Sequence, residues 1–197
     1  MKKTRLRFDL VLLGAPAAGK DTQAALLQRK FALKPVESGK YLRGLQRNKT
    51  KIGALVRETA ALGLPAPVDL IKEFLTANIR LAPKDRDLIF VGNPRLKPEA
   101  EFLRKLFLAN DRDFLVLYIT LPAAEIWERS AKRMRGVEDS KYISRRIAWH
   151  KKQVGLTVKY FQKLNKLQVI NGDQPVKKVN QDILKTINDY RKSRTTR

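Results

Sequence analysis

Apolar residues gather along the chain in five short runs that are rich in β-branched or aromatic side chains. Four of the runs are almost continuously apolar, and each run is followed by a turn signal and then by a helical pattern. Runs of this length and composition are typical of strands buried on both faces of a parallel sheet. The predicted strands span residues 8–13, 34–37, 87–91, 114–119 and 167–170.

Between the strands, apolar residues recur at the spacing of amphipathic helices. The longest such stretch carries Ile143, Ile147, Val154, Val158 and Phe161 on one face. The predicted helices span residues 19–30, 39–48, 51–62, 67–80, 96–109, 122–134, 141–165 and 175–191. This alternation predicts an α/β protein in which helices cover both faces of a central five-stranded parallel sheet.

Length, charge and cysteine content narrow the choice of function. The chain has 197 residues, which suits one domain, and it has no cysteine for disulfides or thiolate chemistry. Lys and Arg number 42 against 19 Asp and Glu, so the net charge of +23 favours polyanions as partners. The first apolar run is too short for a signal peptide, and no run reaches the length of a membrane span. We therefore expect a cytoplasmic protein that does not enter a membrane.

The stretch GAPAAGKDTQ, residues 14–23, joins the first predicted strand to the first predicted helix. It fits the pattern G-x-x-x-x-G-K, in which backbone N–H groups and the lysine bind phosphates at the positive end of the helix dipole. The residues predicted to bind the triphosphate are Gly14, Ala15, Pro16, Ala17, Ala18, Gly19, Lys20, Asp21 and Thr22. The chain is therefore predicted to have the three-layer P-loop NTPase fold.

Further segments make the chain resemble the adenylate kinase family of nucleoside monophosphate kinases, from residue 8 to about residue 190. The family segments S-T-G-D-x-L-R and D-G-F-P-R correspond to ESGKYLR (37–43) and VGNPR (91–95). Weaker matches are GLPAPVDLI (63–71), ERSAKRMRG (128–136), ISRRI (143–147) and VINGDQPVKKV (169–179). The resemblance implies Mg²⁺-dependent transfer of the γ-phosphoryl group of ATP to a nucleoside monophosphate, with AMP preferred.

The resemblance also implies a role for each matching residue. The implied catalytic residues are Lys20, Arg95, Arg133 and Arg146. Arg129 and Gln174 join the phosphate loop in the implied ATP site. The implied monophosphate site comprises Ser38, Gly39, Arg43, Leu64, Pro65, Ala66, Gly92, Arg95, Glu99, Arg135 and Arg146. Arginine suits such a site because its planar fork binds phosphate with two hydrogen bonds and stays charged.

The same resemblance divides the single domain, 1–197, into parts. The implied core comprises about 8–37, 69–131 and 141–190, with a monophosphate-binding insert at about 38–68, a short lid at about 132–140 and a basic tail at 191–197. Because the lid is short, we expect the insert to make most of the movement that excludes water. A monomer is expected.

At several positions the chain lacks a carboxylate that the family has, or has one that the family lacks. Val91 stands where the family has the aspartate that supports hydrated Mg²⁺, and valine cannot bind a metal. Asp21 follows Lys20, where other P-loop proteins place a Mg²⁺-binding hydroxyl. We therefore predict that Asp21 supplies the missing carboxylate, directly or through water; the alternative is an exposed aspartate favoured by the helix dipole. In the S-T-G-D segment, Lys40 replaces the aspartate and Glu37 replaces the serine.

Glu99 stands where the family has a glutamine that contacts adenine. A carboxylate only accepts hydrogen bonds, so it can take the N6 amino group of adenine but cannot donate to N1, whereas guanine offers two donors. AMP remains the predicted acceptor, with GMP or another monophosphate as the alternative. A second alternative is a non-catalytic relative that binds nucleotides or nucleic acid through its basic surface.

Overall fold

A five-stranded parallel sheet forms the centre of the molecule. The computed structural model describes residues 3–132 and 140–195, without the side chains of residues 140–143, 146 and 195. The strands are β1 (Asp9–Gly14), β2 (Leu33–Glu37), β3 (Asp87–Val91), β4 (Phe114–Thr120) and β5 (Leu167–Asn171). Their order across the sheet is β2-β3-β1-β4-β5, all parallel. The predicted strands are confirmed to within one residue at each end.

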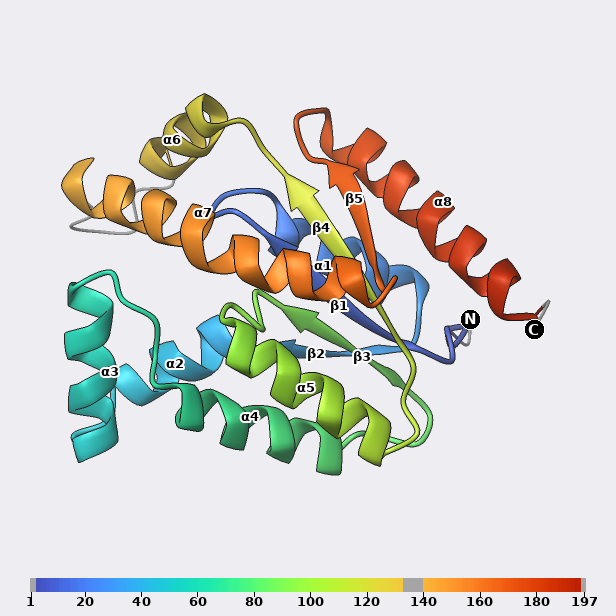
Figure 1. The fold of residues 1–197 in the computed structure, drawn as a ribbon, viewed down its shortest axis with the longest axis horizontal. Coiled ribbons are helices and arrows are strands. Elements are labelled where there is room, and N and C mark those ends of the chain that lie inside the picture. Colours follow the sequence, from blue (N-terminus) through green and yellow to red (C-terminus); the bar gives the residue numbers. More distant parts are fainter. Residues whose placement is uncertain (1–2, 133–139, 196–197) are drawn as a thin grey trace.

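Helices cover both faces of this sheet (Figure 1). They are α1 (Lys20–Lys30), α2 (Ser38–Gln46), α3 (Lys51–Ala61), α4 (Val68–Arg80), α5 (Lys97–Ala109), α6 (Ala123–Lys132), α7 (Ser140–Lys163) and α8 (Val176–Thr195). Within the described residues, no helix combines the length and the apolar character needed to cross a bilayer. The predicted three-layer α/β architecture is confirmed.

Alternate residues of each strand pack into two separate apolar cores. In β1, Leu10 and Leu12 belong to the core shared with α1 and α8, whereas Val11 and Leu13 belong to the core shared with α4, α5 and α7. All four side chains are buried. This double burial explains why the strands read as continuous apolar runs and not as alternating ones.

The amino-terminal edge of the sheet is held by two buried aspartates. Asp9 accepts two hydrogen bonds from Arg112, at 2.6 and 2.7 Å, and one from the backbone N–H of Leu88 at 2.7 Å. Asp87 accepts the backbone N–H of Leu6 at 2.7 Å. Hydrogen bonds of this kind compensate the cost of burying a carboxylate. These aspartates lie at the end of the sheet opposite the phosphate loop, so they serve the fold.

The last helix is longer than the predicted 175–191, because α8 continues to Thr195 and takes in most of the segment 191–197 that was predicted to be a basic tail. The last turns of α8 are tied to the body of the protein by Arg194. Its guanidinium pairs with Asp113 at 2.7 Å, donates to the carbonyl of Arg7 at 2.9 Å and lies over the ring of Phe8. A composition rich in Lys and Arg gave no sign of these long-range contacts.

Candidate active site

The carboxyl ends of the strands meet at one edge of the sheet, which is where ligands bind in open α/β folds. The phosphate loop joins β1 to α1 at this edge, and the segments after β2 and β3 lie beside it. Figure 1 shows α2, α3 and α6 toward this end of the molecule, whereas both chain termini lie at the opposite end. The fold therefore gathers the motif residues from distant parts of the sequence.

The backbone of the phosphate loop departs from ordinary strand and helix geometry. Gly14 has φ +152°, and a Cβ there would lie 2.5 Å from the carbonyl oxygen of Ile119. Only glycine therefore allows β1 to pair with β4 up to its last residue. Ala17 has φ +60°, a left-handed conformation that is strained for alanine. The phosphate-loop motif predicts a binding role for Ala17 but gives no sign of this strain.

The side chain of Lys20 folds back over the phosphate loop. Its Nζ donates to the carbonyl oxygens of Gly14 and Ala15, at 2.9 and 2.7 Å. The ammonium group therefore lies at the mouth of the loop. A terminal phosphate placed over the loop amides lies within reach of this group, as the motif requires.

Gly92 lies close to the side chains of both Lys20 and Arg95. A Cβ on Gly92 would stand 3.9 Å from both Lys20 Cε and Arg95 Nη2, and φ at this residue is +73°. Arg95 also donates from Nε to the Gly92 carbonyl oxygen at 3.0 Å. The structure thus brings the side chains of Lys20 and Arg95 close to the same residue, directly after β3.

Two buried side chains hold the backbone of Arg95. The carboxylate of Glu99, 1% exposed, accepts the Arg95 N–H at 2.7 Å and the Leu96 N–H at 3.3 Å, which caps α5. The hydroxyl of Thr157, 0% exposed, donates to the Arg95 carbonyl at 3.0 Å. Burial raises the pKa of Glu99, although the two backbone hydrogen bonds oppose the rise. No sequence motif marks Thr157, because its partner lies in a distant part of the chain.

The structure gives Glu99 a structural role besides the one predicted for it. One carboxylate oxygen is occupied by the backbone of the Arg95 loop, so Glu99 positions that arginine. Recognition of the acceptor base by Glu99 remains a prediction.

Arg43 and Ser38 lie in α2, at the start of the predicted insert. Arg43 reaches back toward the amino end of α2, where its Nη1 would stand 3.2 Å from a Cβ on Gly39. A larger residue at position 39 would displace this guanidinium. The hydroxyl of Ser38 is buried and has no hydrogen-bond partner among the described residues. Buried hydroxyls are rarely left in that state, which is compatible with a ligand role for Ser38.

The remaining insert residues lie between α3 and α4. Leu64 is exposed, Pro65 is half-buried, and Ala66 packs against the core that includes α4. Exposed apolar residues of the insert are Ile52, Leu55, Leu62 and Leu64. The burial of residues 64–66 does not test whether they contact the monophosphate. That contact stays a prediction.

Arg129 joins α6 to the loop after β5. Its Nε donates to Glu125 at 2.9 Å, and its Nη2 lies 3.7 Å from Asp173. Gln174, in the same loop, donates to the carbonyl of Asn171 at 2.8 Å and to Asp182 at 2.7 Å. Arg129 therefore contacts the loop that carries Gln174, the other of these two residues predicted to bind ATP.

The lid arginines are only partly described. Arg133 and Arg135 lie outside the described residues, and Arg146 lies in α7 with its side chain outside that description. Their predicted roles stay predictions.

The carboxylates near the phosphate loop are sparse. Asp21 and Thr22 are exposed in the first turn of α1, whereas Val91 is buried at the end of β3. In the described part of the chain, no group of three or more His, Asp or Glu residues is placed to hold a metal ion. Mg²⁺ bound with ATP keeps water and phosphate ligands and needs only one or two carboxylates. The residues present fit that mode.

Comparison with known proteins agrees with this geometry. The adenylate kinase family model matches residues 12–166. The adenylate kinase of Bacteroides fragilis is 26% identical over 185 residues, which cover 91% of this chain and 98% of that protein. The adenylate kinase of Prochlorococcus marinus is 29% identical over 179 residues, which cover 90% of this chain and 97% of that protein. The sheet order, the phosphate loop and these matches together show that the chain belongs to the adenylate kinase family of phosphotransferases.

Proposed function

We propose that this chain converts ATP and AMP to two molecules of ADP at the sheet edge formed by the phosphate loop, the end of β3 and the start of α2. The observation that carries the proposal is the convergence of Lys20 and Arg95 on Gly92. One cation belongs to the donor loop and the other to the segment that follows β3. A phosphoryl group in transit between two nucleotides needs cations from both sides.

The reaction needs positioning and charge neutralisation more than covalent chemistry. A phosphate oxygen of AMP attacks the γ-phosphorus of ATP, the bond to the β–γ bridging oxygen breaks, and that oxygen leaves with ADP. The loop amides and Lys20 bind the donor phosphates, while Arg43 and Arg95 bind the AMP phosphate. Backbone anchoring of Arg95 by Glu99 and Thr157 fixes the direction from which the acceptor approaches.

The other predicted residues complete the two nucleotide sites. Arg129 stacks on the base of ATP and Gln174 also binds ATP, while Arg133, Arg135 and Arg146 close over the transferred group. The insert, about 38–68, closes over AMP and excludes water, which protects ATP from hydrolysis. We propose that the protein is a cytoplasmic monomer.

Mg²⁺ is the proposed cofactor, with Asp21 as a carboxylate that holds it directly or through water. When bound, the ion neutralises charge on the phosphates. Asp21 lies one residue after Lys20, in the first turn of α1, which directly follows the loop. Asp21→Gly removes the carboxylate. The proposal expects this variant to need more Mg²⁺ for half-maximal turnover, and an unchanged Mg²⁺ dependence would contradict it.

The acceptor is tested by comparing kcat/KM for AMP, GMP, CMP and UMP at saturating ATP. We expect AMP to be strongly preferred. A preference for GMP would assign the base-reading role to Glu99 instead. Absence of turnover with every acceptor, together with tight and salt-dependent RNA binding, would favour the non-catalytic alternative.

A further inference from the structure

Glu37 lies at the carboxyl ends of the strands, on the same side of the sheet as the phosphate loop. It is the last residue of β2, and its Cα is the register partner of Val91, the last residue of β3. Strands of a sheet lie about 4.8 Å apart, so Glu37 presents a carboxylate one strand beyond the position of Val91.

Glu37 projects to the face of the sheet that α1 covers. Val91 belongs to the core shared with α1 and α8, whereas Val36 and its register partner Phe90 belong to the opposite core. Side chains alternate along a strand, so Glu37 shares the face of Val91. This is also the face on which α1 follows the phosphate loop.

The carboxylate of Glu37 has no assigned partner despite the abundance of cations. Glu37 is the N-cap residue of α2, but its side chain does not cap the helix. Among the described residues, none of the ion pairs or side-chain hydrogen bonds involves this half-buried carboxylate. Beside bound triphosphate, an uncompensated carboxylate would repel the ligand. A cation between the two anions removes that repulsion.

We propose that Glu37 holds the Mg²⁺ of the bound nucleotide through a water molecule, from the strand next to Val91. This inference rests on the proposed function and assigns to the metal a second carboxylate besides Asp21. Glutamate is one methylene longer than aspartate, which compensates part of the extra strand of separation. A Mg²⁺ ion that keeps several waters is within reach through one of them.

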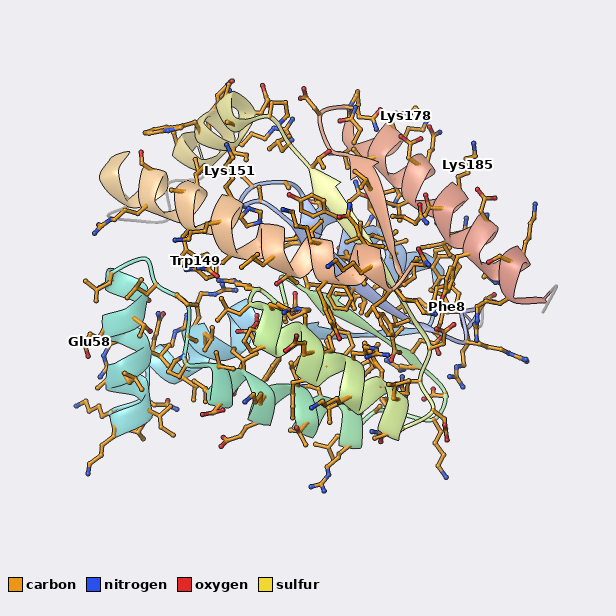
Figure 2. All side chains as sticks on the ribbon, in the orientation of Figure 1. Phe8, Glu58, Trp149, Lys151, Lys178 and Lys185 are labelled. Atoms are coloured by element: carbon orange, nitrogen blue, oxygen red, sulfur yellow. The ribbon has the colours of Figure 1, made fainter. Side chains whose placement is uncertain are left out.

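The test measures Mn²⁺ binding, not turnover. Mn²⁺ is titrated into the protein saturated with AMP and an ATP analogue that has nitrogen between its β and γ phosphorus atoms, and unbound Mn²⁺ is counted from its EPR signal. Glu37→Gln should weaken Mn²⁺ binding about tenfold, the usual effect of losing a partner outside the first coordination sphere. Glu58→Gln is the matched control, because Glu58 is exposed on α3 of the insert, away from the phosphate loop (Figure 2).

A double variant tests whether a carboxylate at a neighbouring position can replace that of Glu37. Val91→Asp in the Glu37→Gln background returns a carboxylate to the same face on the neighbouring strand, and Mn²⁺ affinity should recover most of the loss. Nucleotide affinity without metal, measured by calorimetry, should not be lower in Glu37→Gln than in the wild type, because the variant lacks the carboxylate that repels triphosphate when no cation is bound. Unchanged Mn²⁺ affinity in Glu37→Gln, an equal loss of metal-free nucleotide affinity, or no recovery in the double variant would overturn the proposal.

Failure of this inference is distinguishable from failure of the proposed function. If the wild type forms no ADP from ATP and AMP, the proposed function fails. If the wild type forms ADP and binds Mn²⁺ while Glu37→Gln binds Mn²⁺ equally well, only the role of Glu37 fails.

Discussion

The carboxylate of Glu99 accepts the backbone N–H of Arg95 at 2.7 Å from within the first turn of α5. One buried side chain thus ends the loop after β3, starts the next helix and fixes the arginine that stands beside Lys20. This contact predicts that stability and turnover are coupled at position 99.

Glu99→Ala should lower both the folding stability and the turnover of AMP. Loss of a helix cap costs about 1 kcal/mol of folding stability, and the released Arg95 loop should lower kcat/KM for AMP about tenfold. Urea unfolding and steady-state kinetics measure the two effects. Glu101→Ala on the same helix is the control, since Glu101 is half-exposed and forms a surface ion pair with Lys97. Equal kinetics in the two variants would contradict the anchoring role.

Thr157→Val removes the other anchor of Arg95 with little change of shape. The unsatisfied Arg95 carbonyl should cost about 1–2 kcal/mol of stability and lower kcat/KM several-fold. Thr186→Val is the matched control, because that hydroxyl donates to Asp182 in its own helix, away from the site. If Thr157→Val loses stability but keeps the wild-type kcat/KM, then Thr157 serves the fold alone.

Ala17→Gly should stabilise the protein. Alanine at φ +60° carries a strain of about 1–2 kcal/mol that glycine does not, and the greater freedom of glycine in the unfolded chain cancels part of the gain. We expect a net gain of about 0.5–1 kcal/mol in the free energy of unfolding. Ala18→Gly, at a buried position without positive φ, should instead destabilise by about 1 kcal/mol. A change of the same sign in the free energy of unfolding of both variants would contradict the strain assigned to Ala17.

Lowering the pH should weaken the contacts by which Asp113 holds α8 to the body of the protein. Burial raises the pKa of Asp113, but hydrogen bonds with Lys166 and Tyr190 outweigh it and lower the pKa below the ordinary 3.8. Asp113 therefore stabilises the fold above about pH 4 and loses this effect as the pH falls through its lowered pKa. At neutral pH, Asp113→Asn should cost about 1–3 kcal/mol.

The pH dependence of that cost is the diagnostic result. Urea unfolding of the wild type and Asp113→Asn should show a stability difference that shrinks as the pH falls below 3.8. Asp189→Asn, at an exposed position of α8, should show little difference at any pH. A difference for Asp113→Asn that stays constant down to the acid end would contradict the assignment.

Sequence patterns predicted the features whose causes are local. Buried parallel strands need continuous apolar runs, and phosphate binding needs small residues before Lys20, so both could be recognised from neighbouring residues. The anchors of Arg95 and of α8 could not, because Thr157 and Arg194 contact residues far away in the sequence. The strain at Ala17 was also hidden, because a small residue fits the motif whatever its backbone conformation.

The most direct test is ADP formation from ATP and AMP in a coupled assay, with Arg95→Ala and Arg80→Ala beside the wild type. Arg80 is exposed at the end of α4, so its variant makes the same charge change away from the site. The wild type and Arg80→Ala should turn over alike, and Arg95→Ala should lose about a hundredfold or more in kcat/KM. A wild type that forms no ADP, or an Arg95→Ala variant as active as Arg80→Ala, would contradict the account.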